Sequence, residues 1–455
     1  MTDTLRIESR GALLRGDRYL AFLGFVLLGY ALIGKGFAYL GLPPLYMGEI
    51  AFLSGIVVFL GTGVSFGALA TLPALLLIAL MALVLARTIP FVGIYGFDAL
   101  RDSTIVMYGG FAFIMIGLLL EDARRINLVL HLYRIMLTCV PVMFVCAWLT
   151  KYWGEDIPKL FGPVPIVQLG PSIVGTHLAG TMVFALIGYR KVSVAWLLVW
   201  LATLALIGAT NRGALLAALV PIAIAMLALR RYRLMIATAV VTVVTFAALL
   251  TIESAFGTYE EAKDSMDRPV SAHQLLENAK SVIGQSGGHQ GEGTKRWRLN
   301  WWDIIINDTI HGPNFWTGRG FGLNLADADG FGGTSDRHDP RPPTRSPHNA
   351  HMTMLARAGV PGLLMWEIVL LSWFATMATA IVTARLRGHE RWLELFVFVV
   401  CYLTAILINA TFDVVLEGPM QGIWFWCLFG FGLGSVMIYR AQPFDGLRRQ
   451  VRDDL

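Results

Sequence analysis

About twelve apolar segments, most of them close to 20 residues long, run through this chain of 455 residues. A helix needs about 20 apolar residues to cross the hydrocarbon core of a bilayer. Hydrophobic residues make up 56% of the sequence and charged residues only 15%, whereas soluble domains carry about 25% charged residues. The sequence therefore predicts an all-α polytopic membrane protein with about twelve transmembrane helices.

One long polar loop separates the apolar segments into two groups. Residues 1–252 predict an N-terminal transmembrane bundle of about nine helices, and residues 351–439 predict about three more. Residues 253–350 form the loop, and residues 440–455 form a polar tail. No small-residue cleavage site follows the first apolar segment promptly, which favours a retained helix over a removed signal peptide.

Arginine and lysine are distributed unequally over the connections between these segments. The side that holds the N-terminus carries arginine pairs such as Arg124–Arg125 and Arg230–Arg231, and the short connections on the other side carry few basic residues. Because basic residues collect on the cytoplasmic side, we expect both termini in the cytoplasm and the long loop outside. The net charge of +5 belongs to these membrane edges and does not indicate a nucleic-acid partner.

The long loop ends at a polar run, Ser346 to His351, directly before the next apolar segment. Ser346 can cap a helix and Pro347 suits its first position, which places His348 in the first turn near free backbone N–H groups. The helix dipole there disfavours imidazolium, so His348 is expected to be neutral and able to act as a general base. The alternative is a polar cap at the membrane surface. His351, one turn further, would orient or line the site.

Arg212 is the second candidate, at the outer start of an apolar segment. Thr210 or Asn211 can cap this helix, and an arginine beside a helix N-terminus forms a binding site for an anion. Gly213 would let a substrate approach the backbone closely. The alternative is an interfacial arginine that reaches to water, although arginine is uncommon on the outer side of a membrane.

Lys35, Arg87 and Arg101 could extend an anion-binding patch, or only reach to water at the membrane edge. Arg319 lies in a flexible glycine-rich turn with Gly318 and Gly320 and could contact a substrate from there. Arg298 lies on a helix predicted over residues 294–310 and could instead pack that helix onto the membrane face. The candidates for substrate binding are Arg319, Gly318, Gly320, Asn349, His351, Arg298, Lys35, Arg87 and Arg101.

Polar residues in or near the apolar segments are candidates by default, or pair with a neighbour: Glu49, His177, Arg357 and Glu367. Asp413 and Glu417 lie in the outer turn of the last apolar hairpin and could orient a base or bind a substrate hydroxyl.

Neither the acidic residues nor the four cysteines show the spacing of a metal site. The runs Asp327–Asp329 and Asp336–Asp339 lack the calcium and zinc patterns, which favours solvated turns. All four cysteines lie within apolar segments and are expected to be buried packing thiols. The sequence also has no nucleotide or dinucleotide fingerprint, so we expect no metal and no cofactor.

These residues together resemble the bacterial O-antigen ligase and Wzy-type O-antigen polymerase superfamily. The resemblance extends from about residue 207 to residue 434 and rests on Arg212–Gly213 after Thr210–Asn211, on Arg298 with Trp302, on Gly318-x-Gly320-x-Gly322, on His348–Asn349 followed by Gly359-Val360-Pro361-Gly362, and on the segment from Asn409 to Pro419. The first half of the chain is similar to the family only in hydropathy.

The resemblance implies an inverting, metal-independent glycosyltransferase with a GT-C-like fold in the bacterial inner membrane, with its active site facing the periplasm. A glycan on undecaprenyl diphosphate would enter from the outer leaflet, where Arg212 binds the diphosphate. His348 would deprotonate an acceptor hydroxyl that attacks the anomeric carbon. The family has an aromatic residue where His351 stands, so two imidazoles compete for the role of base.

The acceptor distinguishes the members of this superfamily. A ligase of lipopolysaccharide biosynthesis transfers the glycan to the lipid A core, whereas an O-antigen or exopolysaccharide polymerase joins it to a second lipid-linked glycan. Transfer to a protein is a third possibility. The long loop after the ninth apolar segment favours the ligase slightly.

A transporter or flippase for a lipid-linked sugar is the alternative of a different class. Transporters usually consist of two related halves with broken helices and with polar residues near the middle of the membrane. In this sequence the polar residues gather at one outer face, and no internal repeat is visible. We therefore expect an enzyme in which the side chains of Arg212 and His348 face one outer cavity.

Overall fold

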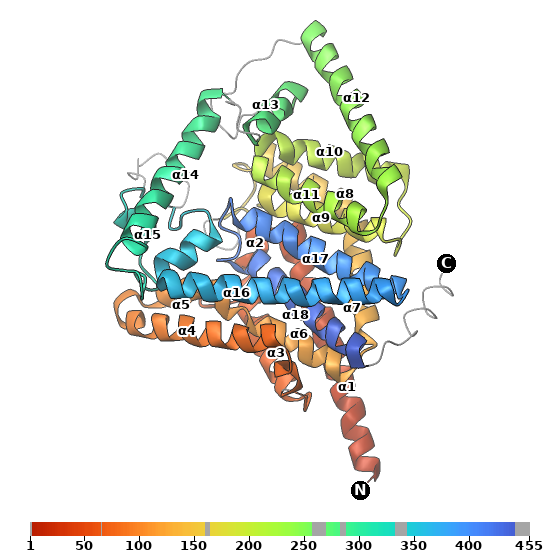
Figure 1. The fold of residues 1–455 in the computed structure, drawn as a ribbon, viewed down its shortest axis with the longest axis vertical. Helices are drawn as coiled ribbons and strands as arrows, with labels where there is room; N and C mark the ends of the chain where they lie inside the picture. Colours follow the sequence, from red (N-terminus) through yellow and green to blue (C-terminus); the bar gives the residue numbers. More distant parts are fainter. Residues whose placement is uncertain are drawn as a thin grey trace.

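The computed structural model describes residues 2–64, 66–159, 164–256, 270–282, 288–332 and 344–441. The elements in these ranges are helices, apart from one short ribbon that pairs β1 (Gly41–Leu42) with β2 (Leu45–Tyr46) (Figure 1). The prediction of an all-α protein is therefore confirmed. The acidic run Asp336 to Asp339 and most of the polar tail lie outside the described residues.

The helices follow the apolar segments of the sequence. Before the long loop lie α1 (Thr2–Leu32), α2 (Lys35–Ala38), α3 (Met47–Leu60), α4 (Leu72–Tyr95), α5 (Phe97–Met107), α6 (Gly110–Glu121), α7 (Arg125–Thr138), α8 (Val140–Trp153), α9 (Pro171–Leu186), α10 (Val194–Thr210), α11 (Arg212–Ala228) and α12 (Tyr232–Phe256). The loop contains α13 (Ala272–Val282), α14 (Gly288–Thr309) and α15 (Leu325–Ala328). After it come α16 (Ala350–Leu386), α17 (Glu390–Ala410) and α18 (Pro419–Ala441).

Several of these helices are long and apolar enough to cross a membrane. Among the described residues there are five, namely α4, α12, α16, α17 and α18. Two bent pairs raise the number to seven if each pair is one span: α5 with α6, bent by 42°, and α7 with α8, bent by 52°. The chain is therefore a polytopic membrane protein, although this count is smaller than the twelve expected from hydropathy because α3, α9, α10 and α11 are apolar but shorter.

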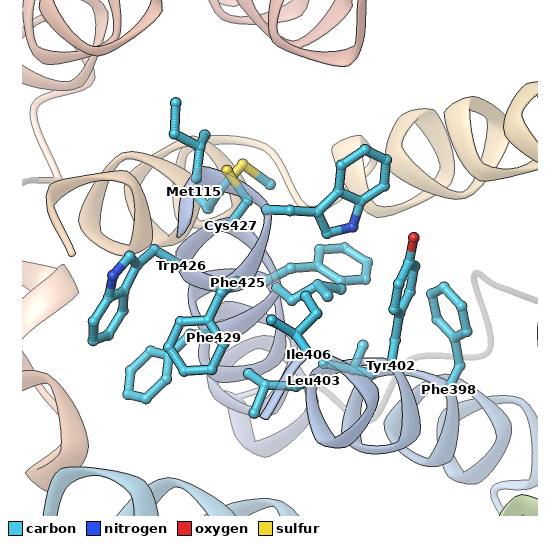
Figure 2. Close-up of a cluster of buried hydrophobic side chains, with 14 of the residues drawn as sticks. Met115, Phe398, Tyr402, Leu403, Ile406, Phe425, Trp426, Cys427 and Phe429 are labelled. Atoms are coloured by element: carbon cyan, nitrogen blue, oxygen red, sulfur yellow. The ribbon is translucent and has the colours of Figure 1, made fainter. Parts of the chain in front are cut away.

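One part of the core lies where α18 packs against α6 and α17. Figure 2 shows Met115 of α6 close to Cys427 of α18, and Tyr402 of α17 in the same cluster. A Cβ added to Gly430 would lie 2.3 Å from the carbonyl oxygen of Ala112, so only glycine permits this approach of α18 to α6. Of the cysteines, Cys401 and Cys427 are buried as expected, whereas Cys139 and Cys146 are partly exposed.

Helix α16 is broken near its start, and the break connects this helix to the long loop. Gly359 has a φ of 69° and a ψ of −170°, which interrupts the helix, and Pro361 has no N–H to donate. The carbonyls of Ala356 and Arg357 thereby lose their helical partners. They accept instead from the N–H groups of Arg319 (2.8 Å) and Gly320 (3.0 Å).

The glycine-rich turn is therefore packed into the structure, where the sequence predicted a flexible turn. Gly318, Gly320 and Gly322 all have positive φ. A Cβ on Gly320 would lie 2.0 Å from the ring of Phe91, and one on Gly322 would lie 2.6 Å from Tyr95, both on α4. Figure 1 shows α14, α15, α5 and the first part of α16 together at one end of the bundle. The turn joins the long loop to this end.

Candidate functional site

His348 lies outside the helix that the sequence predicted to contain it. Asn349 is the N-cap of α16, because its side-chain oxygen accepts from the N–H groups of His351 (2.9 Å) and Met352 (3.2 Å). Ser346 is therefore not the cap, and the expectation that His348 sits in the first helical turn was wrong. His348 adopts a φ of 53°, a conformation that is strained for a residue other than glycine and that concentrates at functional sites.

The ring of His348 is held by a carboxylate. Its Nδ1 lies 3.3 Å from Oδ1 of Asp413, in the turn between α17 and α18. Burial alone would raise the pKa of Asp413, but hydrogen bonds from His348, from the hydroxyl of Ser172 and from the N–H of Val414, together with the charge of His348, bring that pKa below its ordinary value. An ionised carboxylate on Nδ1 leaves Nε2 to receive a proton, which is the arrangement of a general base with its orienting partner.

The backbone around His348 is also fixed. Trp302 of α14 donates from its indole N–H to the carbonyl of Pro347 at 2.9 Å. Thr353, in the first part of α16, donates to Glu417 at 2.7 Å, and Glu417 lies in the same turn as Asp413. Burial raises the pKa of Glu417, and the nearby Arg357 opposes that rise. His348 and the Asp413 turn are therefore held together by contacts on both sides.

A buried ion pair also stabilises the arrangement around His348. Arg357 of α16 is 0% exposed, and its guanidinium lies 2.9 Å from the carboxylate of Asp102 on α5. Arg345, three residues before His348, reaches the same carboxylate at 3.4 Å. Because a buried charge without its partner is costly, these contacts tie α5, α16 and the end of the long loop together.

Arg212 begins α11, as the sequence predicted. The cap is Asn211, whose side chain accepts from the N–H of Ala214 at 3.0 Å. A Cβ on Gly213 would lie 3.1 Å from the Cβ of Phe412, the residue before Asp413. The start of α11 therefore packs against the turn that carries the partner of His348.

The start of α9 meets the same turn. The hydroxyl of Ser172 bonds to the carboxylate of Asp413, and Gly175 packs on the backbone of Ala214 in α11. Sequence reasoning missed Ser172, since nothing in the surrounding residues marks a hydroxyl whose partner lies in a distant turn. The N-terminal ends of α9 and α11 thus converge beside the pair His348–Asp413, and helix N-termini attract anions.

Arg298 of α14 lies near this group. Burial lowers the pKa of its guanidinium, and the carboxylate of Asp413 opposes that effect, which indicates that the two charges are close. The Nε of Arg298 is buried and has no hydrogen-bond partner within the described part of the chain. A buried N–H donor without an acceptor is costly, so this atom is available to a ligand.

The other predicted basic residues lie elsewhere or are paired. Arg319 bonds to Asp308 and Asp329, both at 2.6 Å, within the long loop. The remaining pairings are Arg87 Nε to the carbonyl of Thr317 (2.8 Å), and Arg101 to Asp98 (3.0 Å) and Asp102 (3.1 Å). Gly318 and Gly320 pack against α16 and α4. Lys35 is exposed, and its backbone N–H bonds to Gln168, just before α9. These contacts favour structural roles for Arg319, Arg87 and Arg101.

His351 has a carboxylate partner of its own. Its Nδ1 lies 2.5 Å from Oε1 of Glu367, on the far side of the break in α16. Two imidazole–carboxylate pairs therefore exist at this end of the molecule. Of the two pairs, His348–Asp413 is the one near Arg212, because the start of α11 packs against the turn that carries Asp413.

Asp413→Asn is expected to lower the rate of any reaction in which His348 takes up a proton, by about 100-fold, because a neutral amide no longer stabilises the imidazolium.

The same substitution is expected to change how the stability of the fold depends on pH. The pKa of Asp413 lies below its ordinary value, so the carboxylate stabilises the fold above the unfolded pKa of about 3.9, and this contribution disappears as the pH falls through the lower folded pKa. Thermal unfolding of both proteins in detergent, at a series of pH values, measures this difference.

Asp303→Asn is the matched control, since Asp303 is exposed on α14, in the long loop. The control should unfold and react like the unsubstituted protein. A difference between Asp413→Asn and the unsubstituted protein that grew on acidification would contradict the proposed ionisation of Asp413.

Comparison with known families gives an independent result. Residues 197–366 match the family model described as O-antigen ligase. The matched segment extends from α10 into α16 and contains Arg212, Arg298 and His348, but not Asp413. No curated protein sequence matches the chain. The match confirms the resemblance that the motifs indicated: this segment is similar to the O-antigen ligase family.

Proposed function

We propose that this protein is a glycosyltransferase that moves a glycan from undecaprenyl diphosphate to an acceptor hydroxyl at the outer face of the bacterial inner membrane. The observation that carries the proposal is the meeting of the start of α11 with the turn that holds the pair His348–Asp413. This contact supports a binding site for an anion next to a general base, which transfer from a diphosphate requires.

Arg212 and the N-terminus of α11 would bind the diphosphate. A diphosphate leaves with the electron pair of its bond to the sugar, so its negative charge grows in the transition state. The fork of an arginine and the N-terminus of a helix both favour that charge. Arg298, whose Nε has no acceptor in the described residues, would supply a further donor.

His348 would act on the acceptor. Its Nε2 would take the proton of the acceptor hydroxyl while the hydroxyl oxygen forms a bond to the anomeric carbon and the bond from that carbon to the diphosphate oxygen breaks. Asp413 stabilises the imidazolium that results. Because attack and departure occur on opposite faces of one carbon, a single displacement inverts the anomeric configuration.

The proposal includes the membrane topology. Residues 1–252 and 351–439 would form the transmembrane bundle, and residues 253–350 would form a periplasmic catalytic loop, in a GT-C-like arrangement with both termini cytoplasmic. If α1 and the shorter apolar helices α3, α9, α10 and α11 also cross the bilayer, the total reaches the expected number of about twelve. The distribution of arginine supports this orientation.

A transporter of lipid-linked sugars is the second candidate, because α16 is broken and the buried His177 lies with its Nδ1 2.6 Å from the hydroxyl of Tyr402. In transporters the carbonyls at a helix break line a cavity and bind an ion. Here the carbonyls of Ala356 and Arg357 bond to the backbone of the long loop. This favours the enzyme.

Reconstitution into vesicles tests the proposal. The protein is supplied with an undecaprenyl-diphosphate oligosaccharide and with lipid A core, and the products are separated by length. Release of undecaprenyl diphosphate with one glycan added to the core identifies a ligase. A ladder of longer glycans that remain on undecaprenyl diphosphate identifies an O-antigen or exopolysaccharide polymerase. Movement of the intact donor between leaflets, without loss of its glycan, would contradict an enzyme and support the transporter.

A further inference from the structure

An aromatic side chain of the long loop contacts His348, and a second aromatic side chain contacts the first. The ring of Trp297, on α14, lies 5.7 Å from the ring of His348 at an angle of 69°. Phe331, after α15, lies 5.9 Å from Trp297 at an angle of 85°, so the edge of one ring meets the face of the other. Trp301, one turn after Trp297, is fully buried and stacks on Phe331 at 5.1 Å, whereas Trp297 and Phe331 remain partly exposed. We call Trp297 and Phe331 the aromatic platform.

The aromatic platform is held rigidly relative to His348. Trp301 donates from its indole N–H to Asp329 at 2.7 Å, and Asp329 is also paired with Arg319 at 2.6 Å. Trp302 of the same helix donates to the carbonyl of Pro347, directly before His348. These contacts attach α14, which carries Trp297, to the residues just before Phe331 and just before His348. They therefore hold the two rings and the imidazole next to each other without a ligand.

Trp297 and the carboxylate partner of His348 come from different elements. Nδ1 of His348 is turned to Asp413, and the start of α11 with Arg212 packs on the turn that carries Asp413. Trp297 approaches the same imidazole from α14, in the long loop. A molecule that lies on the ring of Trp297 is therefore next to the base, which in the proposed reaction acts on the acceptor.

We propose that Trp297 and Phe331 form the binding subsite for a pyranose ring of the acceptor, an inference that rests on the proposed function. One face of a pyranose consists of C–H groups with a slight positive charge, and the face of an aromatic ring is negative, so the two stack while the hydroxyl groups point outward. Small-molecule sites commonly combine such aromatic surfaces with few polar groups. The subsite favours a carbohydrate acceptor over a serine or threonine of a protein.

Substitutions at Trp297 test the subsite in the reconstituted protein. Trp297→Leu is expected to raise the KM for the acceptor about tenfold, since it removes one stacking partner. The KM for the undecaprenyl-diphosphate donor and the rate at saturating acceptor should change by less than about twofold. Trp297→Phe, which keeps an aromatic face, should restore most of the affinity. Trp316→Leu is the matched control, because Trp316 belongs to the same loop and is 76% exposed.

A second measurement separates the subsite from the reaction. Calorimetric titration of the protein in nanodiscs with free core oligosaccharide should give a Kd about tenfold weaker for Trp297→Leu than for Trp316→Leu. Equal Kd values, or a rise in the KM of donor and acceptor alike, would overturn the subsite. If core oligosaccharide binds in a Trp297-dependent way but no glycan is transferred, the proposed reaction fails and the subsite stands.

Discussion

His348→Ala is expected to lower the rate of glycan transfer about 1,000-fold, because a positioned general base contributes a factor of about 100 to 10,000. The donor should still bind with unchanged affinity, since the proposal assigns the binding of its diphosphate to Arg212 and the start of α11. Single-turnover transfer in vesicles, with a separate measurement of donor binding, gives both quantities.

His351→Ala is the natural comparison, since His351 also has a carboxylate partner, Glu367 at 2.5 Å. Its rate is expected to stay within about tenfold of the unsubstituted protein, as for a residue that only lines the site. If His351→Ala loses more activity than His348→Ala, the base is the imidazole paired with Glu367, and the role of Asp413 must be reassigned.

Arg212→Ala is expected to reduce kcat/KM for the donor about 100- to 1,000-fold, the usual effect of removing one group that stabilises a developing negative charge. Arg212→Lys keeps the charge but loses the planar fork, so its activity should fall between those of the alanine variant and the unsubstituted protein. Steady-state kinetics with varied donor concentration measure the effect.

Arg233→Ala serves as the control for a general loss of positive charge, because Arg233 is exposed beyond the opposite end of α11. It should react like the unsubstituted protein. Equal kinetics for Arg212→Ala and Arg233→Ala would show that Arg212 only reaches to water at the membrane surface.

Local sequence signals predicted the elements that depend on local forces. Hydropathy located most of the helices, and the two possible caps, Thr210 and Asn211, correctly predicted a helix start here, which the structure gives at Arg212 with Asn211 as the cap. The helix expected over residues 294–310 is present as α14. Such features follow from hydrogen bonds and burial within a few residues, which the sequence displays directly.

The surroundings of His348 depended on distant contacts and were predicted only in part. Both Ser346 and Asn349 are residue types that cap helices well, and in the structure the cap is Asn349. With this cap, His348 has a positive φ and the carbonyl of Pro347 accepts from Trp302. Asp413 was a candidate partner for a base, but its pairing with His348 brings together residues far apart in the chain.

The basic residues show the same limit. Arg319 and Arg212 were both candidates for substrate binding in the sequence. The structure gives Arg319 two carboxylates, Asp308 and Asp329, from separate parts of the long loop. Only the folded arrangement shows that Arg319 is neutralised by the protein itself.

We propose that Arg212 and His348 act in one transfer, in which Arg212 binds the diphosphate of the donor and His348 takes the proton of the acceptor hydroxyl that attacks the first sugar of the donor. The most direct test is photo-cross-linking with an undecaprenyl-diphosphate oligosaccharide whose first sugar carries a photoreactive group, followed by mass spectrometry of the labelled peptides. The account predicts labels on the peptides that contain Arg212, His348 and Asp413. Labels confined to the buried region around His177 and Tyr402 would contradict it and would place the sugar where a transporter binds its cargo.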